Sequence, residues 1–226
     1  MNQTITANTI RVFAGGRSLS GGTLGVGGPG GFSVGGTQAF VNTVVGRGQS
    51  GALGPALQRT DFGPWGGAIT FDSDNSTNWN FALTPPTAGS GQADFLSVAL
   101  HELGHLLGIG TADSWKNLIT GTTFNGPKSI ALNGGVNPST TADKGHFASG
   151  TSYLGQEVSM TPNISLSSRK NFTELDFGGL DDLGWNVVPV PEPATVLGLA
   201  TAGLAGVWGV RRRVARLTGS EAPAAV

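Results

Sequence analysis

The chain has 226 residues, enough for one sizeable domain with a hydrophobic core and an appendage. Only 12% of the residues are charged and the net charge is −1, which argues against nucleic acid and acidic membrane surfaces as partners. Cysteine is absent, which excludes disulfides, and the 38 glycines follow no period of three, which excludes a collagen-like fibre. We therefore expect long, turn-rich connections between strands.

Four segments in the first third of the chain have the β-branched and aromatic composition that is typical of strands. They span residues 4–13, 37–45, 67–71 and 78–81. The third follows a Pro-Trp-Gly-Gly turn, and the fourth follows the polar turn at residues 72–77. The first half of the chain is therefore expected to form a sheet.

The clearest helix of the sequence is predicted from Asp94 to Leu107. Asp94 is a good N-cap after a flexible Gly-Ser-rich stretch. Four leucines at positions 96, 100, 103 and 107 recur at helical spacing and predict one buried stripe. Gly108 and Gly110 are expected to end the helix.

The C-terminal half is predicted to be poor in regular structure until one last helix. Residues 111–170 indicate loops, with at most a short helical turn at 115–119. A helix is expected over 174–183, because Thr173 and Asp176 have the spacing of a capping box and Gly184 follows its end.

The chain contains only three histidines, and two of them form an H-E-x-x-H motif, His101 to His105. Residues four apart share one face of a helix, so both imidazoles can reach the same metal ion. Glu102 lies beside them and is expected to act as a general base on a metal-bound water. The motif therefore predicts a catalytic zinc site rather than a chance occurrence on an amphipathic helix.

A catalytic zinc needs a third protein ligand and keeps one position open for water. His146, 41 residues after His105, is our preferred third ligand. Asp113, just after the helix, is the main competitor, although it is also placed to cap the next turn. Glu157 is a weaker alternative, because no helical pattern carries it.

Residues 95–108, FLSVALHELGHLLG, resemble the zinc helix of the metzincin clan of metallopeptidases, in its matrixin-like branch. Thr111 stands where that family has its third histidine, so His146 would come from an insertion over 109–145, as in leishmanolysin-like metzincins. The resemblance implies an α+β, zincin-like fold: a twisted mixed sheet packed on the zinc helix, then a loop-rich C-terminal subdomain with a closing helix. It also implies a Met-turn at Met160, a closing helix within 171–185, and an edge strand at 65–71 that aligns the substrate.

Tyr153 and the pair Asp72 and Asp74 are two further candidate sites, and each also has a simpler structural interpretation. Tyr153, the only tyrosine, could donate a hydrogen bond to the oxyanion of a tetrahedral intermediate, but a packed tyrosine is the simpler interpretation. Asp72 and Asp74 could hold a calcium ion, although the loop lacks the glycine and distal glutamate of an EF-hand. A solvated turn is the favoured interpretation there.

The C-terminal segment has the composition of a membrane anchor. Pro189 to Pro193 forms a stiff linker, residues 194–210 are uncharged and mostly apolar, and Arg211 to Arg213 follow. Seventeen helical residues span about 26 Å, at the short end for crossing a bilayer, with the arginines on the cytoplasmic side. A buried core helix is the less favoured alternative.

This order of features resembles the PEP-CTERM sorting signal of Gram-negative bacteria. The resemblance implies export to the cell envelope and processing by an exosortase-type sorting enzyme, with anchoring that is at least transient. Export predicts an N-terminal signal peptide, whose pattern residues 1–13 lack, so we expect the natural start to lie upstream. We divide the chain into a catalytic domain (1–188), a linker (189–193), a sorting segment (194–217) and a tail (218–226).

The sequence thus predicts an exported zinc-dependent endopeptidase that acts on protein or peptide substrates. His101, His105 and His146 bind zinc, Glu102 is the general base and acid, and Met160 supports the site. The alternative is a non-catalytic, glycine-rich surface protein that uses zinc only to stabilise its fold. A structural site has no use for Glu102 and fills its fourth position with protein, which makes this alternative the weaker one.

Overall fold

A computed structural model of the protein describes residues 4–48 and 62–188. Its main sheet has the strand order β1-β3-β2, formed by β1 (Arg11–Arg17), β3 (Gly66–Asp72) and β2 (Gly25–Pro29). Strand β1 runs parallel to β3 and β2 runs antiparallel to it. This small mixed sheet, combined with a few helices, confirms the predicted α+β, zincin-like fold class.

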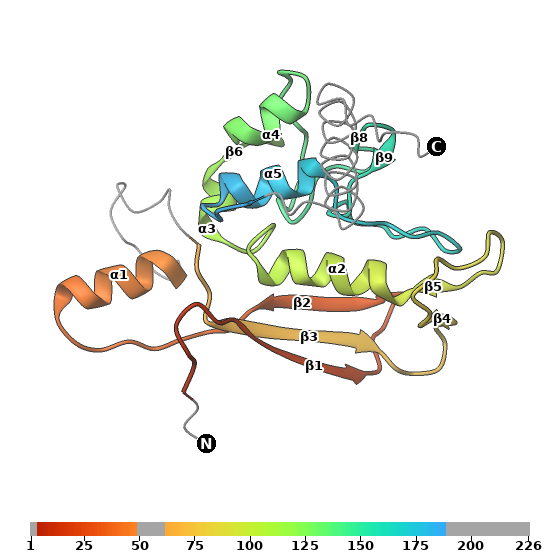
Figure 1. The fold of residues 1–226 in the computed structure, drawn as a ribbon, viewed down its shortest axis with the longest axis horizontal. Helices are drawn as coiled ribbons and strands as arrows, with labels where there is room; N and C mark the ends of the chain where they lie inside the picture. Colours follow the sequence, from red (N-terminus) through yellow and green to blue (C-terminus); the bar gives the residue numbers. More distant parts are fainter. Residues whose placement is uncertain (1–3, 49–61, 189–226) are drawn as a thin grey trace, which may run out of the picture. The chain divides into compact units, whose positions relative to one another are not determined.

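Helix α2 (Phe95–Leu106) packs along the sheet and carries the H-E-x-x-H motif (Figure 1). Asp94 caps it as predicted, because its carboxylate accepts a hydrogen bond from the Ser97 amide at 3.1 Å. Gly108 adopts a φ of +113°, in the left-handed region that favours glycine, and ends the helix as expected.

The glycines of β2 allow its backbone to lie directly against α2. A Cβ added to Gly27 would stand 2.5 Å from the Glu102 carbonyl oxygen, and one added to Gly67 of β3 would stand 2.9 Å from Leu106. Several glycines that indicated loops therefore lie inside strands. They serve close packing between sheet and helix rather than turns.

The buried face of α2 differs from the predicted leucine stripe, which was wrong. Leu96 is 37% exposed, and the other three leucines of that stripe are only half-buried. The buried positions combine two apolar residues with polar ones and a glycine, namely Val98, Leu106, Ser97, His101, Glu102 and Gly104. Helix α2 is covered on two sides, by the sheet and by the C-terminal half, so no single leucine face needs to carry its burial.

The strand predicted over 37–45 was wrong, because this segment forms helix α1 (Gln38–Gly48). Its four apolar residues follow one another at i, i+1, i+4 and i+5, which is the period of a helix face rather than of a strand. The Gln38 side chain donates a 2.7 Å hydrogen bond to Asn42, one helical turn away.

Three other strand predictions need adjustment. Strand β1 begins only at Arg11, after a turn in which Asn8 has a φ of +59°. The segment 78–81 contributes only β4 (Trp79–Asn80), which pairs in parallel with β5 (Ala93–Asp94). The predicted edge strand, β3, is the central strand, because β1 and β2 pair with both of its sides, so the edge nearest α2 belongs to β2.

The C-terminal half contains more regular structure than its sequence indicated. It has α3 (Asp113–Asn117), α4 (Pro127–Leu132) and two short hairpins, β6 (Ile119–Thr120) with β7 (Thr123–Phe124) and β8 (Ser152–Tyr153) with β9 (Gln156–Glu157). The predicted closing helix is present as α5 (Glu174–Asp182), with its capping box between Thr173 and Asp176. Trp115, Phe124 and Phe147 form a fully buried ring cluster at the centre of this half.

The predicted linker, apolar segment and tail, residues 189–226, lie outside the described residues. Over residues 4–48 and 62–188, no helix combines the length and the apolar character that a bilayer crossing requires.

Candidate metal centre

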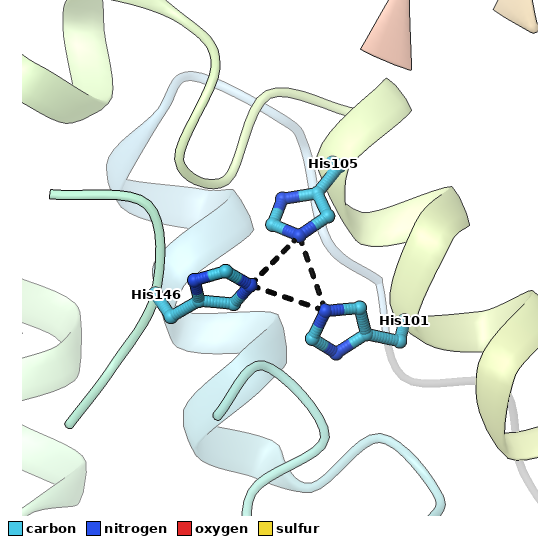
Figure 2. Close-up of side chains that lie close together, drawn as sticks. All are labelled: His101, His105 and His146. Carbon is cyan, nitrogen blue, oxygen red and sulfur yellow. Dashed lines mark hydrogen bonds between the residues drawn. The ribbon is translucent and has the colours of Figure 1, made fainter. Parts of the chain in front are cut away.

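The three histidines of the chain converge on one point, from two segments far apart in the sequence (Figure 2). His101 and His105 extend from successive turns of α2, and their Nε2 atoms lie 3.1 Å apart. The Nε2 atom of His146 lies 3.3 Å from that of His101 and 3.1 Å from that of His105. The structure therefore brings the predicted triad together.

Two backbone carbonyls fix the protonation of the helix histidines. His101 Nδ1 donates to the Ser159 oxygen and His105 Nδ1 donates to the Ile109 oxygen, both at 2.8 Å. A carbonyl can only accept, so in the neutral rings the proton is on Nδ1 and Nε2 presents a lone pair. The 3.1 Å approach of these two Nε2 atoms thus places lone pairs face to face, an arrangement that a cation between them stabilises.

The geometry of the triad fits a tetrahedral metal such as zinc. Nitrogens bound at 2.0–2.1 Å to a tetrahedral ion stand about 3.3 Å from one another. The separations of 3.1 to 3.3 Å in this site are close to that value. Within the described parts of the chain, this group has three members, which leaves one tetrahedral position without a protein ligand.

His146 reaches the site because two glycines let its loop contact the end of α2. Gly110 has a φ of +76°, and a Cβ on it would stand 1.9 Å from the Gly145 carbonyl oxygen. Only glycine permits so close an approach of two backbones. Thr111, which occupies the family's usual third-histidine position, instead donates from Oγ1 to the His105 carbonyl at 2.6 Å.

Burial keeps the triad uncharged. Burial and, to a smaller extent, the neighbouring His105 together lower the pKa of His101 to about 3 and that of His146 to about 4. Burial also lowers the pKa of His105. Neutral imidazole is the form that binds a metal, so the site is ready for one across the physiological pH range.

Glu102 lines the same cleft as the triad. This cleft has a volume of about 560 Å³, and β2, the end of α2, the His146 loop and residues 162–164 form its walls. Burial raises the pKa of the Glu102 carboxyl to about 7, while a hydrogen bond from the Gly27 backbone opposes the rise. A carboxyl that titrates near neutral pH can both accept and return a proton there.

Met160 is fully buried and packs against Gly104 of α2. A Cβ on Gly104 would stand 2.3 Å from the Met160 sulfur, which explains why glycine separates the two helix histidines in the H-E-x-x-H motif. The neighbouring Ser159 supplies the carbonyl that orients His101. This segment therefore supports the triad through both packing and hydrogen bonding.

Asp176 has a second role that the capping pattern did not indicate. Besides closing the capping box of α5, its carboxylate accepts hydrogen bonds from the Ser159 and Met160 amides, each at 3.0 Å. Burial raises its pKa, and these hydrogen bonds pull the pKa down. A capping box is a local pattern, so it carries no signal for a contact 16 residues upstream.

The structure does not bring the other candidates into the site. Tyr153 packs against the C-terminal core and is not among the residues that line the cleft. Asp113 is exposed in the first turn of α3. Glu157 forms an ion pair with Lys170 at 3.0 Å.

Within the described residues, Asp72 and Asp74 do not belong to a group that could hold a metal ion, so calcium binding there has no support. The Asp72 carboxylate accepts from the Leu19 amide at 2.9 Å and from the Thr77 hydroxyl at 2.7 Å. Asp74 accepts from the Ser76 amide at 2.9 Å. The exposed Asp74 contact agrees with the solvated turn that was favoured, whereas Asp72 is buried and connects the turn to residue 19.

Comparison with known proteins identifies two segments. Residues 42–133 match the Matrixin family, and residues 189–213 match the PEP-CTERM protein-sorting motif. No curated protein and no solved structure matches the chain. The Matrixin match includes His101, Glu102 and His105 and ends before His146. Residues 42–133 are thus similar to a family of zinc-dependent metallopeptidases, and the PEP-CTERM motif at 189–213 indicates export to the cell envelope.

Proposed function

We propose that the protein is an exported zinc-dependent endopeptidase, with His101, His105 and His146 as the metal ligands. The observation that carries this proposal is the convergence of three histidine Nε2 atoms at tetrahedral spacing in a cleft that also contains Glu102. Zinc, when bound, supplies a water of lowered pKa and polarises the scissile carbonyl.

Glu102 carries the proton transfers of the proposed reaction. Its carboxylate takes a proton from the attacking water and returns it to the leaving amine. Its position beneath the β2 glycines, with a pKa near 7 in the metal-free protein, suits both steps. Met160 and Asp176 act indirectly, because they hold the floor of the site and the carbonyl that orients His101.

The free edge of β2 offers a place for an extended peptide. Among residues 4–48 and 62–188, β3 is the one strand paired with β2, and residues 25–27 line the cleft beside the triad. A peptide added to this edge would form backbone hydrogen bonds and pass across the metal site. This role replaces the one that the sequence assigned to β3.

The alternative, a zinc-stabilised surface protein without catalysis, has less support. A structural zinc site is closed by four protein ligands, whereas the group found in the described residues has three. A buried carboxyl beside an open metal position has no structural benefit, because its burial costs free energy.

For the remaining residues, we propose that the PEP-CTERM motif directs an exosortase-type enzyme to the chain, with 194–210 as a transient membrane anchor. The described residues 4–48 and 62–188 would then form the catalytic domain outside the cytoplasm. Deleting 189–226 is expected to release the protein from the cell envelope, and unchanged retention would argue against this assignment.

The test of the catalytic proposal is Glu102→Gln, compared with Glu174→Gln as a matched control on the exposed first turn of α5. We expect Glu102→Gln to keep its zinc content and to lose at least about 100-fold in cleavage of an unfolded casein substrate. Glu174→Gln is expected to match the wild type, and a chelator should abolish its activity. Undiminished cleavage by Glu102→Gln would refute the proposed mechanism.

A further inference from the structure

His146 is held by hydrogen bonds within its own loop. Its amide donates to the Thr141 hydroxyl at 3.1 Å, and its carbonyl accepts from the Thr141 amide at 3.0 Å. The same hydroxyl donates to Asp143 Oδ1 at 2.5 Å, and the Gly145 amide donates to that oxygen at 2.9 Å. The Thr141 hydroxyl is therefore the central contact of a closed six-residue loop that ends at the third histidine.

Contacts with the core fix this loop from outside. Lys144 adopts a φ of +61°, and its carbonyl accepts a 2.8 Å hydrogen bond from the indole of the fully buried Trp115. After His146, the Phe147 amide donates to the Met160 carbonyl at 2.9 Å. A left-handed conformation at a lysine costs free energy, so the surrounding contacts must hold it in place.

These contacts distinguish two ways in which His146 could come to lie beside His101 and His105. One route is that the metal recruits a mobile loop and orders it on binding, at an entropic cost. The hydrogen bonds of the loop favour the other route, because they fix both backbone groups of His146 without any metal contact.

We propose that Thr141 and Asp143 are positioning residues that hold His146 ready for the metal, so that the site is largely formed before the metal binds. This inference rests on the proposed zinc site. His146 fills the ligand position that Thr111 cannot, and Thr141 and Asp143 hold His146 there. Positioning partners of metal ligands typically contribute about 10- to 100-fold to metal affinity.

The test compares two substitutions at Thr141, with zinc affinity measured by titration against a competing chelator. Thr141→Val keeps the shape and removes the hydroxyl, whereas Thr141→Ser keeps the hydroxyl. We expect Thr141→Val to weaken zinc binding by about 10- to 100-fold and Thr141→Ser to stay within about 3-fold of the wild type. The melting temperatures of the metal-free variants show whether an effect is local.

Asp143 provides a second test that remains if Thr141→Val fails to fold. Asp143→Asn keeps an acceptor oxygen for both donors and is expected to bind zinc almost as the wild type does. Asp143→Ala removes the acceptor and is expected to weaken binding toward the level of Thr141→Val. Equal affinity of Asp143→Ala and wild type, or equal weakening by Thr141→Ser and Thr141→Val, would overturn the inference.

His146→Ala separates the two proposals. If the wild type binds zinc tightly and His146→Ala does not, the zinc site is established whatever the Thr141 and Asp143 variants show. If His146→Ala binds zinc as the wild type does, the third ligand itself is wrong, and the positioning role is overturned with it.

Discussion

The contact between β2 and α2 predicts that Ala substitutions at two neighbouring glycines, Gly27 and Gly28, will change the stability of the protein differently. Gly27 faces α2, and a Cβ on it would stand 2.5 Å from the Glu102 carbonyl oxygen and 2.8 Å from the Glu102 Cβ. Gly28 points to the opposite side of the sheet, where a Cβ would meet nothing within 4 Å. Neither glycine has a φ in the left-handed region, so Ala substitution tests packing alone.

The stability changes of the two Ala variants can be estimated from these Cβ distances. Carbon atoms normally keep about 3.5 Å from their neighbours, so Gly27→Ala must push β2 about 1 Å away from α2. Such overpacking costs about 1–3 kcal/mol, against a gain of about 0.4–1 kcal/mol from the less flexible unfolded chain. Gly28→Ala has the gain without the cost. Because the gain is common to both variants, they should differ by the overpacking cost alone, about 1–3 kcal/mol in the free energy of unfolding.

Thermal unfolding measures this difference directly. For a domain of this size, about 1–3 kcal/mol corresponds to roughly 2–12 °C, with Gly28→Ala the more stable variant. Gly27→Ala should also lose peptidase activity, because β2 covers Glu102 and forms one wall of the cleft. Equal melting temperatures of the two variants would refute the close approach of β2 to the helix.

Four further outcomes are expected. Asp176→Ala leaves the Ser159 and Met160 amides without acceptors and should cost about 3–5 kcal/mol by urea unfolding, whereas Asp181→Ala should stay within about 0.5 kcal/mol of the wild type. In the metal-free protein, the free energy of unfolding should fall as the pH drops from about 6.5 to 4. Over this range His101 becomes protonated in the unfolded chain but stays neutral in the folded protein, where its pKa is lowered to about 3. Glu102 has the opposite effect on stability. Its pKa is raised to about 7 in the folded protein, so between pH 7 and 4.5 its carboxyl is protonated in the folded state and ionised in the unfolded state. Glu102→Gln should therefore steepen the acid loss by about 3 kcal/mol, and identical slopes would contradict the burial of Glu102. Chelation should lower the melting temperature of the zinc-loaded protein, because a ligand at 100 times its Kd adds about 2.7 kcal/mol of stability, and an unchanged melting temperature would argue against a bound metal.

Local patterns in the sequence were enough to predict α2, its Asp94 cap, the capping box of α5 and the pairing of His101 with His105. These features depend on hydrogen bonds and side-chain spacing within one or two helical turns, so a short stretch of sequence determines them. Residues 37–45 were wrongly predicted as a strand from their apolar composition, although their apolar residues recur with the period of a helix, the structure that they form.

The position of His146, the exposure of the leucines on α2 and the second role of Asp176 were decided only by the tertiary structure. Each depends on segments distant in sequence, such as Gly110 against Gly145 or α5 against the Met160 segment. The amino-acid composition was enough to predict His146 as the third ligand, because the chain has no other histidine. It could not show which contacts hold the imidazole ring in place. Backbone packing and loop closure determine that, and neither leaves a periodic signal in the sequence.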